Sequence, residues 1–299
     1  MKDRGEEGVA PVARPNTENP PTRRAALDAA TTALAAAGIA SPHRDAELIL
    51  LHVAHITRTD MIGWPDTLLT VEQNAAYQQA IKRRKANEPI QHILGEQEFY
   101  GLRFEVTTDV LIPRPETEHL VEAALERIPM QAHWKIADVG TGSGIIAVTL
   151  ARSRANVEVT ALDISPAALE IARRNAEIHG VLKRIPFLES DLLAAVAEKQ
   201  FDMVVSNPPY IAETDRETLE PQVRDYEPGL ALFGGPTGLE IYQRLIPQAA
   251  RILRPDGWLL MEIGAGQDMQ LKQLLIRWKR ISFVKDLQGI PRVAIAQHL

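Results

Sequence analysis

Residues 135–147 read KIADVGTGSGIIA: a short apolar strand-like run, three alternating glycines and a second apolar run. This order predicts a buried strand, a tight loop and a helix. Gly140, Gly142 and Gly144 let the backbone turn sharply and approach a ligand closely. The first N–H groups of the helix face the same space. The stretch from Gly142 to Ala147 also fits the dinucleotide fingerprint G-x-G-x-x-A, so the glycines alone do not identify the cofactor.

Strands and helices alternate through the C-terminal two thirds of the chain. We predict strands at Lys135–Val139, Val157–Leu162, Ile185–Leu188, Met203–Ser206, Trp258–Ile263, Ile281–Val284 and Val293–Ala296. We predict helices at Glu116–Ile128, Ile145–Ser153, Pro166–His179, Leu239–Leu253 and Gln267–Trp278. This alternation is typical of an α/β protein with a mostly parallel, doubly wound sheet. Such sheets bind ligands outside the carboxyl ends of their strands.

Four segments are predicted along the chain. Residues 1–21 are rich in proline, glutamate, asparagine and glycine, which predicts a disordered tail. Residues 22–88 combine helical periodicity with capping signals, which predicts a small helical domain. Residues 89–112 show glycines and alternating apolar positions, which predicts a β-hairpin linker. Residues 113–299 form the α/β domain.

The composition excludes several classes of protein. The chain of 299 residues contains no cysteine, which rules out disulfides, thiol catalysis and cysteine metal sites and is typical of a cytoplasmic protein. No apolar run approaches the roughly 20 residues of a membrane span. The net charge is −6, so no bulk basic surface indicates a duplex-binding enzyme. We therefore expect no membrane association and no direct contact with nucleic acid.

Two aspartates at strand ends favour S-adenosylmethionine (SAM) as the cofactor. Asp138 precedes the first glycine, where it could hold the cationic amino-acid end of SAM directly or through water. Asp163 ends the next predicted strand, where a carboxylate can accept from both ribose hydroxyls. An NAD enzyme also needs an acid at this second position. The predicted cofactor-binding set is completed by the loop residues Gly140, Thr141, Gly142, Ser143 and Gly144.

A third candidate follows the strand predicted at Ile185–Leu188. Asp191 is a candidate for binding the adenine amine, with Leu192 as an apolar cover on the ring. The alternative is that Asp191 only caps the next helix. The sequence leaves both interpretations open.

The tetrapeptide Asn207-Pro208-Pro209-Tyr210 ends another predicted strand and points to the methyl acceptor. An amide or aniline-like nitrogen has a delocalised lone pair, so two acceptors around its NH₂ group would orient it for attack. The Asn207 side-chain oxygen and the Pro208 carbonyl can supply them. The prolines stiffen the loop and have no N–H to compete, and Tyr210 offers a flat face for a planar acceptor. A turn without chemistry is the alternative.

The three strand-end signals together resemble those of a methyltransferase that uses SAM. Several further sequence strings make the resemblance more specific. They are Glu98–Leu102, Ile112–Glu118, Asp138–Gly144, Ser206–Tyr210, Glu227-Pro228, Leu232–Gly235 and Asp286-Leu287 before Gly289. Together they resemble the release factor glutamine methyltransferases, the PrmC/HemK family. The match runs from about residue 90 to the C-terminus, and the small helical N-terminal domain fits as well.

The resemblance implies a class I SAM-dependent methyltransferase with a doubly wound sheet and a small all-helical N-terminal domain. It implies methylation of the side-chain amide of the glutamine in the Gly-Gly-Gln motif of class I peptide chain release factors, with S-adenosylhomocysteine as product and no metal. SAM contacts are implied for Gly140–Gly144, Asp163 and Asn207, and glutamine contacts for Asn207–Tyr210. Some relatives carry an aromatic residue where this chain has Leu192, which leaves the adenine contact open.

Three alternatives remain at this level. Asn-Pro-Pro-Tyr is shared with enzymes that methylate adenine or guanine amines in nucleic acid, but the helical region is not notably basic. A non-catalytic SAM-binding scaffold would have a broken tetrapeptide, which is intact here. An NAD-linked dehydrogenase lacks an obvious catalytic His, Lys or Tyr at the strand ends and leaves the two prolines unexplained.

Overall fold

The computed structural model describes residues 20–299. The chain divides into two compact units, Met1–Ala86 and Asn87–Leu299. The tail predicted at residues 1–21 lies outside the described residues except for its last two positions. No helix within residues 20–299 combines the length and the apolar character needed to cross a membrane.

The first unit is helical, as predicted. Its helices are α1 (Arg23–Ala36), α2 (Pro42–Ala54), α3 (Arg58–Gly63) and α4 (Val71–Lys85). The predicted capping box at the start of α4 is present: Thr70 and Gln73 exchange side-chain and backbone hydrogen bonds. Leu34, Ile49 and Tyr77 are fully buried between the helices, and the Tyr77 hydroxyl donates to the Ala46 carbonyl at 3.0 Å.

The second unit begins with a short helix, α5 (Ile90–Leu94), which the sequence patterns did not predict, and continues into an antiparallel hairpin. The hairpin strands are β1 (Glu96–Phe99) and β2 (Leu102–Glu105). Phe99 and Phe104 are buried in the same hydrophobic cluster as residues of the main sheet. The hairpin is therefore part of the second unit's core.

A seven-stranded sheet forms the centre of the second unit, in the order β5-β4-β3-β6-β7-β9-β8. The strands are β3 (Lys135–Val139), β4 (Glu158–Asp163), β5 (Phe187–Glu189), β6 (Phe201–Ser206), β7 (Leu253–Glu262), β8 (Lys279–Lys285) and β9 (Pro291–Gln297). The first five strands pair in parallel and the last two pair antiparallel. The mostly parallel, doubly wound sheet predicted from the sequence is thereby confirmed.

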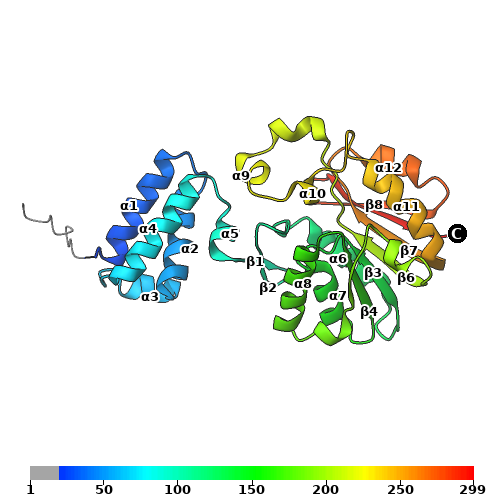
Figure 1. Cartoon of the computed structure of the whole chain (residues 1–299), viewed down its shortest axis with the longest axis horizontal. Helices are drawn as coiled ribbons and strands as arrows, with labels where there is room; N and C mark the ends of the chain where they lie inside the picture. The colour runs from blue at the N-terminus through cyan, green and yellow to red at the C-terminus, as the bar shows by residue number, and fades with distance from the viewer. Residues whose placement is uncertain (1–19) are drawn as a thin grey trace, which may run out of the picture. The chain divides into compact units, whose positions relative to one another are not determined.

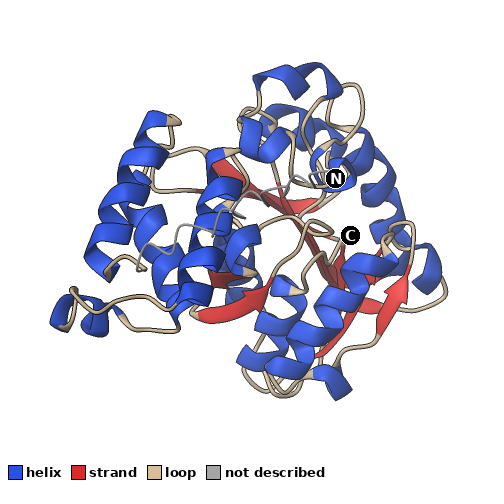
Figure 2. Ribbon diagram, turned by 60° about the vertical axis from the view of Figure 1, so that its left-hand side comes forward, coloured by secondary structure: helices blue, strands red, loops and turns tan. Residues whose placement is uncertain are grey.

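Helices cover both faces of this sheet (Figures 1 and 2). One face packs against α6 (Thr117–Arg127), α7 (Ile145–Ser153) and the end of α8 (Pro166–Ile178). The other face packs against α11 (Glu240–Ile252) and α12 (Asp268–Leu274). Ile136 belongs to the first cluster and Ala137 to the second, as the alternation of side chains along a strand requires.

Some boundaries differ from the prediction. The helix predicted to Trp278 ends at Leu274, because residues 275–278 form a turn from which Trp278 packs on the core. Strand β7 starts at Leu253, five residues before its predicted start, directly after α11 ends. The connection from β6 to α11 also contains short helical turns, η3 (Glu213–Thr218), α9 (Pro221–Arg224) and α10 (Gly229–Leu232); η1 (Leu182–Arg184) and η2 (Ala194–Val196) flank β5.

The strand order reverses at β3, whose neighbours are β4 on one side and β6 on the other. Connections leave β3 and β6 toward opposite sides at this point, so a crevice opens at their carboxyl ends. The glycine loop follows β3, and Asn207 follows β6. The fold therefore brings the two main sequence motifs to one edge of the sheet.

Candidate active site

A cavity of about 310 Å³ lies at the carboxyl ends of β3, β4 and β6. Its lining includes the glycine loop from Gly140 to Ser143, Asp163, Asp191-Leu192 and the loop Asn207–Pro209. Residues of the segments 109–114 and 228–233 also line the cavity, as do Thr117 and Arg244. The predicted cofactor and acceptor residues thus meet around one space, although three of them, Asp138, Gly144 and Tyr210, are not among its lining residues.

The glycine loop is held largely by backbone contacts. The N–H groups of Gly140 and Thr141 both donate to the Leu162 carbonyl, at 2.8 and 2.9 Å. Gly144 has a φ of +82°, and a Cβ there would lie 3.1 Å from the Ala172 side chain of α8. Only glycine fits this position without strain or displacement of α8. Gly144 therefore lets the loop pack on α8 instead of meeting a ligand.

Asp138 is fully buried and stabilises the glycine loop through two hydrogen bonds. Its Oδ2 accepts from the Thr141 hydroxyl at 2.7 Å and from the Ala147 N–H at 3.1 Å. Its Oδ1 has no hydrogen-bond partner among residues 20–299. Burial raises the pKa of this carboxyl group to about 7, against the opposing effect of the two hydrogen bonds.

Asp163 lies at the end of β4 and borders the cavity. Its Oδ2 accepts from the Gly142 N–H at 2.8 Å and its Oδ1 from the Ser165 N–H at 2.9 Å. The Ile164 N–H also interacts with this carboxylate. An ionised carboxylate has about four lone-pair sites, so at least one remains for a further donor. Burial raises its pKa. The glycine loop and the end of β4 are therefore linked through the same carboxylate that can face a ligand.

Asp191 does not cap the next helical turn, which corrects that alternative. Its half-exposed carboxylate pairs with Arg244 of α11, and the Ser190 hydroxyl accepts from the Ala195 N–H instead. Leu192 has a φ of +54°, an unfavourable value for a branched residue, and lines the cavity. Asp191 and Leu192 thus stand side by side at the rim.

The loop after β6 is fixed to β3 and to α6. The Ser206 hydroxyl donates to the Val139 carbonyl at 2.7 Å, so the ends of the two central strands are joined. The Asn207 side-chain Nδ2 donates to the Thr117 hydroxyl at 3.1 Å. A Cβ at Gly140 would lie 3.9 Å from the Asn207 carbonyl oxygen, which shows how closely the glycine loop approaches this loop.

Tyr210 is the last residue of the loop Asn207–Tyr210, the acceptor loop, and its side chain packs on the hydrophobic core. Its ring packs against the core cluster that contains Tyr242 and Met261. Its hydroxyl donates to Glu262 Oε1 at 3.4 Å, and its carbonyl accepts from Gln267 Nε2 at 3.0 Å. Burial and the nearby Glu262 raise the pKa of Tyr210. In this arrangement the ring supports the loop from the core side.

Several residues of the site carried no assigned role in the sequence patterns. The Arg114 guanidinium pairs with the buried Glu227, which also accepts from the Ile112 N–H at 3.1 Å. The Tyr100 N–H donates to the Glu118 carboxylate at 2.8 Å. All of these belong to the strings that carry the family resemblance. The signal was thus present in the sequence, but only the fold shows that the strings bind one another.

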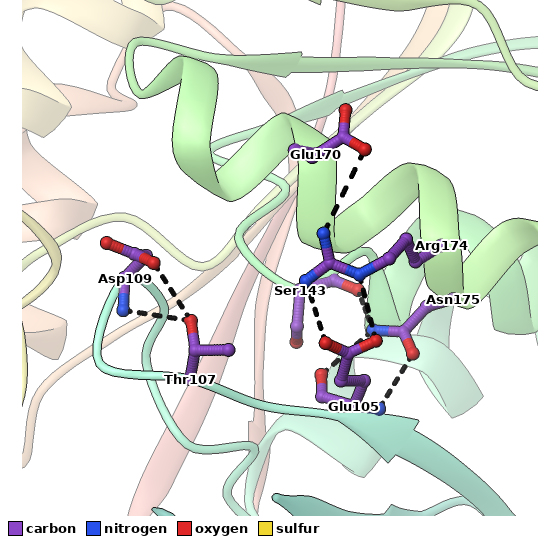
Figure 3. Close-up of polar contacts among 7 residues, drawn as sticks. All are labelled: Glu105, Thr107, Asp109, Ser143, Glu170, Arg174 and Asn175. Atoms are coloured by element: carbon purple, nitrogen blue, oxygen red, sulfur yellow. Dashed lines mark hydrogen bonds and ion pairs between the residues drawn. The ribbon is translucent and has the colours of Figure 1, made fainter.

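Polar contacts also hold the segment after β2, whose residues Asp109 and Val110 line the cavity (Figure 3). Asn175 of α8 accepts from the Glu105 N–H at 2.7 Å and donates to the carbonyls of Glu105 and Ser143 at 3.0 and 2.9 Å. Arg174 makes a two-pronged ion pair with the Glu105 carboxylate. Asp109 of the wall is held by Thr107 at 3.1 Å. Asn175 therefore joins the end of the hairpin to the glycine loop.

Two family models match the chain. Residues 25–95 match the PrmC N-terminal domain, and residues 118–222 match the methyltransferase small domain. Among solved structures, the catalytic domain of hMettl16 in complex with the MAT2A 3'UTR hairpin 6 is similar with a TM-score of 0.55 and 17% identity, covering 76% of this chain and 81% of that one. Human methyltransferase 10 domain containing protein gives a TM-score of 0.50 and 20% identity, covering 67% and 89%. These two likenesses concern the fold alone.

Curated relatives match over most of the chain. The release factor glutamine methyltransferase of Koribacter versatilis is 46% identical over 277 residues, which cover 92% of this chain and 98% of the relative. The protein of the same name from Geobacter sulfurreducens is 41% identical over 284 residues, covering 93% and 98%. The fold is therefore that of the class I SAM-dependent methyltransferases, with a helical N-terminal region. The chain belongs to the release factor glutamine methyltransferase family.

Proposed function

We propose that this protein transfers a methyl group from SAM to the side-chain amide nitrogen of the glutamine in the Gly-Gly-Gln motif of class I peptide chain release factors. One observation carries the proposal: the glycine loop and the Asn207–Pro209 loop line the same cavity. A cofactor held by the first loop and an amide held by the second would lie next to each other. The family of the chain gives the substrate class.

The residues present fit SAM. The cavity is at the lower end of the size range of small-molecule sites. Asp163 lines the cavity and is proposed to accept from the ribose hydroxyls. The unpartnered Asp138 Oδ1 lies behind the cavity lining and is a buried acceptor that the ammonium group would satisfy through water. Asp191 and Leu192 stand where an adenine edge and face would be covered. SAM, when bound, supplies a methyl group on a positively charged sulfur.

The chain's own contribution to the reaction is orientation of the acceptor. The Asn207 Oδ1 and the Pro208 carbonyl would each accept one hydrogen of the glutamine NH₂ group, which directs the nitrogen lone pair toward the methyl group. Holding the reactants in line supplies a large part of such a reaction's barrier lowering. Pro209 stiffens the loop, and Tyr210 supports it from the core side. No strong base is needed before transfer, because the nitrogen becomes acidic once it is methylated.

The helical domain at residues 22–88 is proposed to hold the body of the release factor, with the hairpin at 89–112 as the connection to the methyltransferase domain at 113–299. Removing residues 1–86 should then lower methylation of an intact release factor and leave SAM affinity unchanged. Equal activity of the shortened enzyme would remove the docking role. The reaction yields S-adenosylhomocysteine, needs no metal, membrane or nucleic acid, and belongs in the cytoplasm, where release factors act.

Methylation of an adenine or guanine amine in nucleic acid is the alternative that Asn-Pro-Pro-Tyr leaves open. It is not favoured, because the curated relatives that cover most of the chain are named as release factor glutamine methyltransferases. The likeness to an RNA-bound catalytic domain extends to the fold only.

Incubation with labelled SAM tests the proposal. Label should enter a purified class I release factor and should be absent from the same factor with alanine in place of the motif glutamine. A structured RNA and a DNA duplex serve as parallel acceptors. Label in either nucleic acid, or equal label in the alanine variant, would overturn the proposed substrate.

A further inference from the structure

A buried polar chain leads from the sheet to the acceptor loop. Glu262 is the last residue of β7, Thr117 is the first residue of α6, and Asn207 follows β6. The Thr117 hydroxyl donates to Glu262 Oε2 at 2.6 Å, and the Asn207 Nδ2 donates to the Thr117 hydroxyl at 3.1 Å. Thr117 is fully buried, and Glu262 is 2% exposed. The Thr117–Glu262 bond is therefore shielded from solvent, while the Asn207–Thr117 bond is partly buried at the cavity wall.

The number of protons fixes the direction of the chain. A threonine hydroxyl has one proton to donate, and an ionised carboxylate only accepts. While Glu262 is ionised, the short Thr117–Glu262 contact is a charge-assisted hydrogen bond, and the threonine proton is committed to Glu262. Thr117 can then only accept from Asn207. The NH₂ group of Asn207 must face Thr117, and its Oδ1 must face the other way.

The other oxygen of Glu262 is also used. Tyr210 donates to Oε1 from the core side. Burial raises the pKa of Glu262 to about 7, while the hydrogen bonds from Thr117 and Tyr210 and the charge of Arg292 oppose that rise. Glu262 thus has separate donors at its two oxygens, one from α6 and one from the acceptor loop. This arrangement ties the acceptor loop to β7 at both Asn207 and Tyr210.

We propose that Thr117 and Glu262 are positioning residues that hold the Asn207 amide with its oxygen available to the acceptor NH₂ group. This inference rests on the proposed function and adds two residues to it. If Asn207 were turned by 180°, its own NH₂ group would meet the acceptor's NH₂ group, and one of the two acceptors would be lost. Thr117 prevents this turn because it offers Asn207 an acceptor and no donor.

The decisive variant is Thr117→Val, which keeps the shape and removes the hydroxyl. Turnover of a release factor should fall about tenfold, the rate equivalent of one lost hydrogen bond. SAM affinity, measured by titration calorimetry, should fall less than turnover, because the affected residue, Asn207, orients the acceptor and contributes less to SAM binding. Thr117→Ser retains the hydroxyl and should recover most of the turnover.

Thr149→Val is the matched control. Thr149 is buried in α7, and its hydroxyl has no partner among residues 20–299. The Thr149→Val substitution makes the same chemical change at a buried threonine that does not line the cavity. Its turnover should equal that of the wild type. Equal losses in the Thr117 and Thr149 variants would mean that core polarity in general is responsible, and would overturn the inference.

A double-mutant cycle separates positioning from direct contact, since Thr117 also borders the cavity. In an Asn207→Ala background Thr117 has no amide to orient, so adding Thr117→Val should change single-turnover methylation by less than about twofold. A further loss of about tenfold in that background would show that Thr117 acts independently of Asn207, and the proposed positioning role of Thr117 would be rejected. Failure of the wild type to methylate any release factor would instead count against the proposed function. The cycle would then be measured on the acceptor that the wild type does methylate.

Discussion

The two sides of the cavity are built in different ways. The side proposed for the cofactor is built mainly within residues 138–165, where backbone N–H groups and two aspartates bind one another across at most 21 positions. The acceptor side is assembled from β6, α6 and β7, and its central contact joins residues 145 positions apart. A loop held by contacts close in sequence can be predicted from the sequence. A site whose residues come from distant strands and helices depends on how the whole sheet folds. The two sides should therefore respond differently to substitution.

The largest effect is expected at the acceptor side. Asn207→Ala removes the positioned oxygen and should lower turnover by about 10²-fold or more. SAM affinity should fall less than turnover, because the cofactor side is held by its own contacts. Asn207→Asp keeps an acceptor of nearly the same shape, so its turnover should drop but persist. Single-turnover methylation of a release factor checks both; wild-type activity of the alanine variant would make this loop a structural turn only.

The cofactor side should show the opposite pattern. Asp163→Ala removes charge-assisted hydrogen bonds worth roughly 1.5–3 kcal/mol each, so SAM affinity should fall at least about tenfold. The fold should survive, because the backbone pairing of β4 with β3 and β5 does not involve the Asp163 side chain, and circular dichroism provides that control. Titration calorimetry with unchanged SAM binding would remove Asp163 from the site.

A third substitution tests whether the cofactor side is also stabilised by contacts with parts of the chain that are distant in sequence. Asn175→Ala leaves the partly buried Glu105 N–H and the buried Ser143 carbonyl without their partner, which should lower the free energy of unfolding by about 2 kcal/mol. Its neighbour Arg174 contacts the same Glu105 from a partly exposed position, so Arg174→Ala should cost less than about 1 kcal/mol. Urea unfolding compares the two. Equal costs would mean that the glycine loop does not need the hairpin.

The smallest effect is expected at the rim. Asp191 is half exposed and already paired with Arg244, so Asp191→Ala should weaken SAM binding less than about threefold, in keeping with a solvent-screened contact. Measuring it beside Asp163→Ala ranks the two acids. A loss as large as that of Asp163→Ala would place the adenine amine firmly on Asp191.

Much of the cofactor side was predictable from local patterns. The predicted strand Lys135–Val139 and helix Ile145–Ser153 match β3 and α7 at both ends, because buried periodicity and glycine conformation act within a few residues. The ring of Tyr210, in contrast, was predicted to face the acceptor. Its hydroxyl bonds to Glu262 and its backbone carbonyl to Gln267, and both partners come more than fifty residues later in the chain.

The sequence by itself determined the alternation of strands and helices, the glycine loop and the aspartates at strand ends, since each follows from spacing and backbone freedom over short distances. Only the tertiary structure decided that Thr117 would lie between Asn207 and Glu262, that Glu227 would bind Arg114, and that Asp191 would pair with Arg244. The reason is physical. A buried polar group must find a partner wherever the folded chain brings one, and that partner is set by strand order and helix packing, which no local pattern encodes.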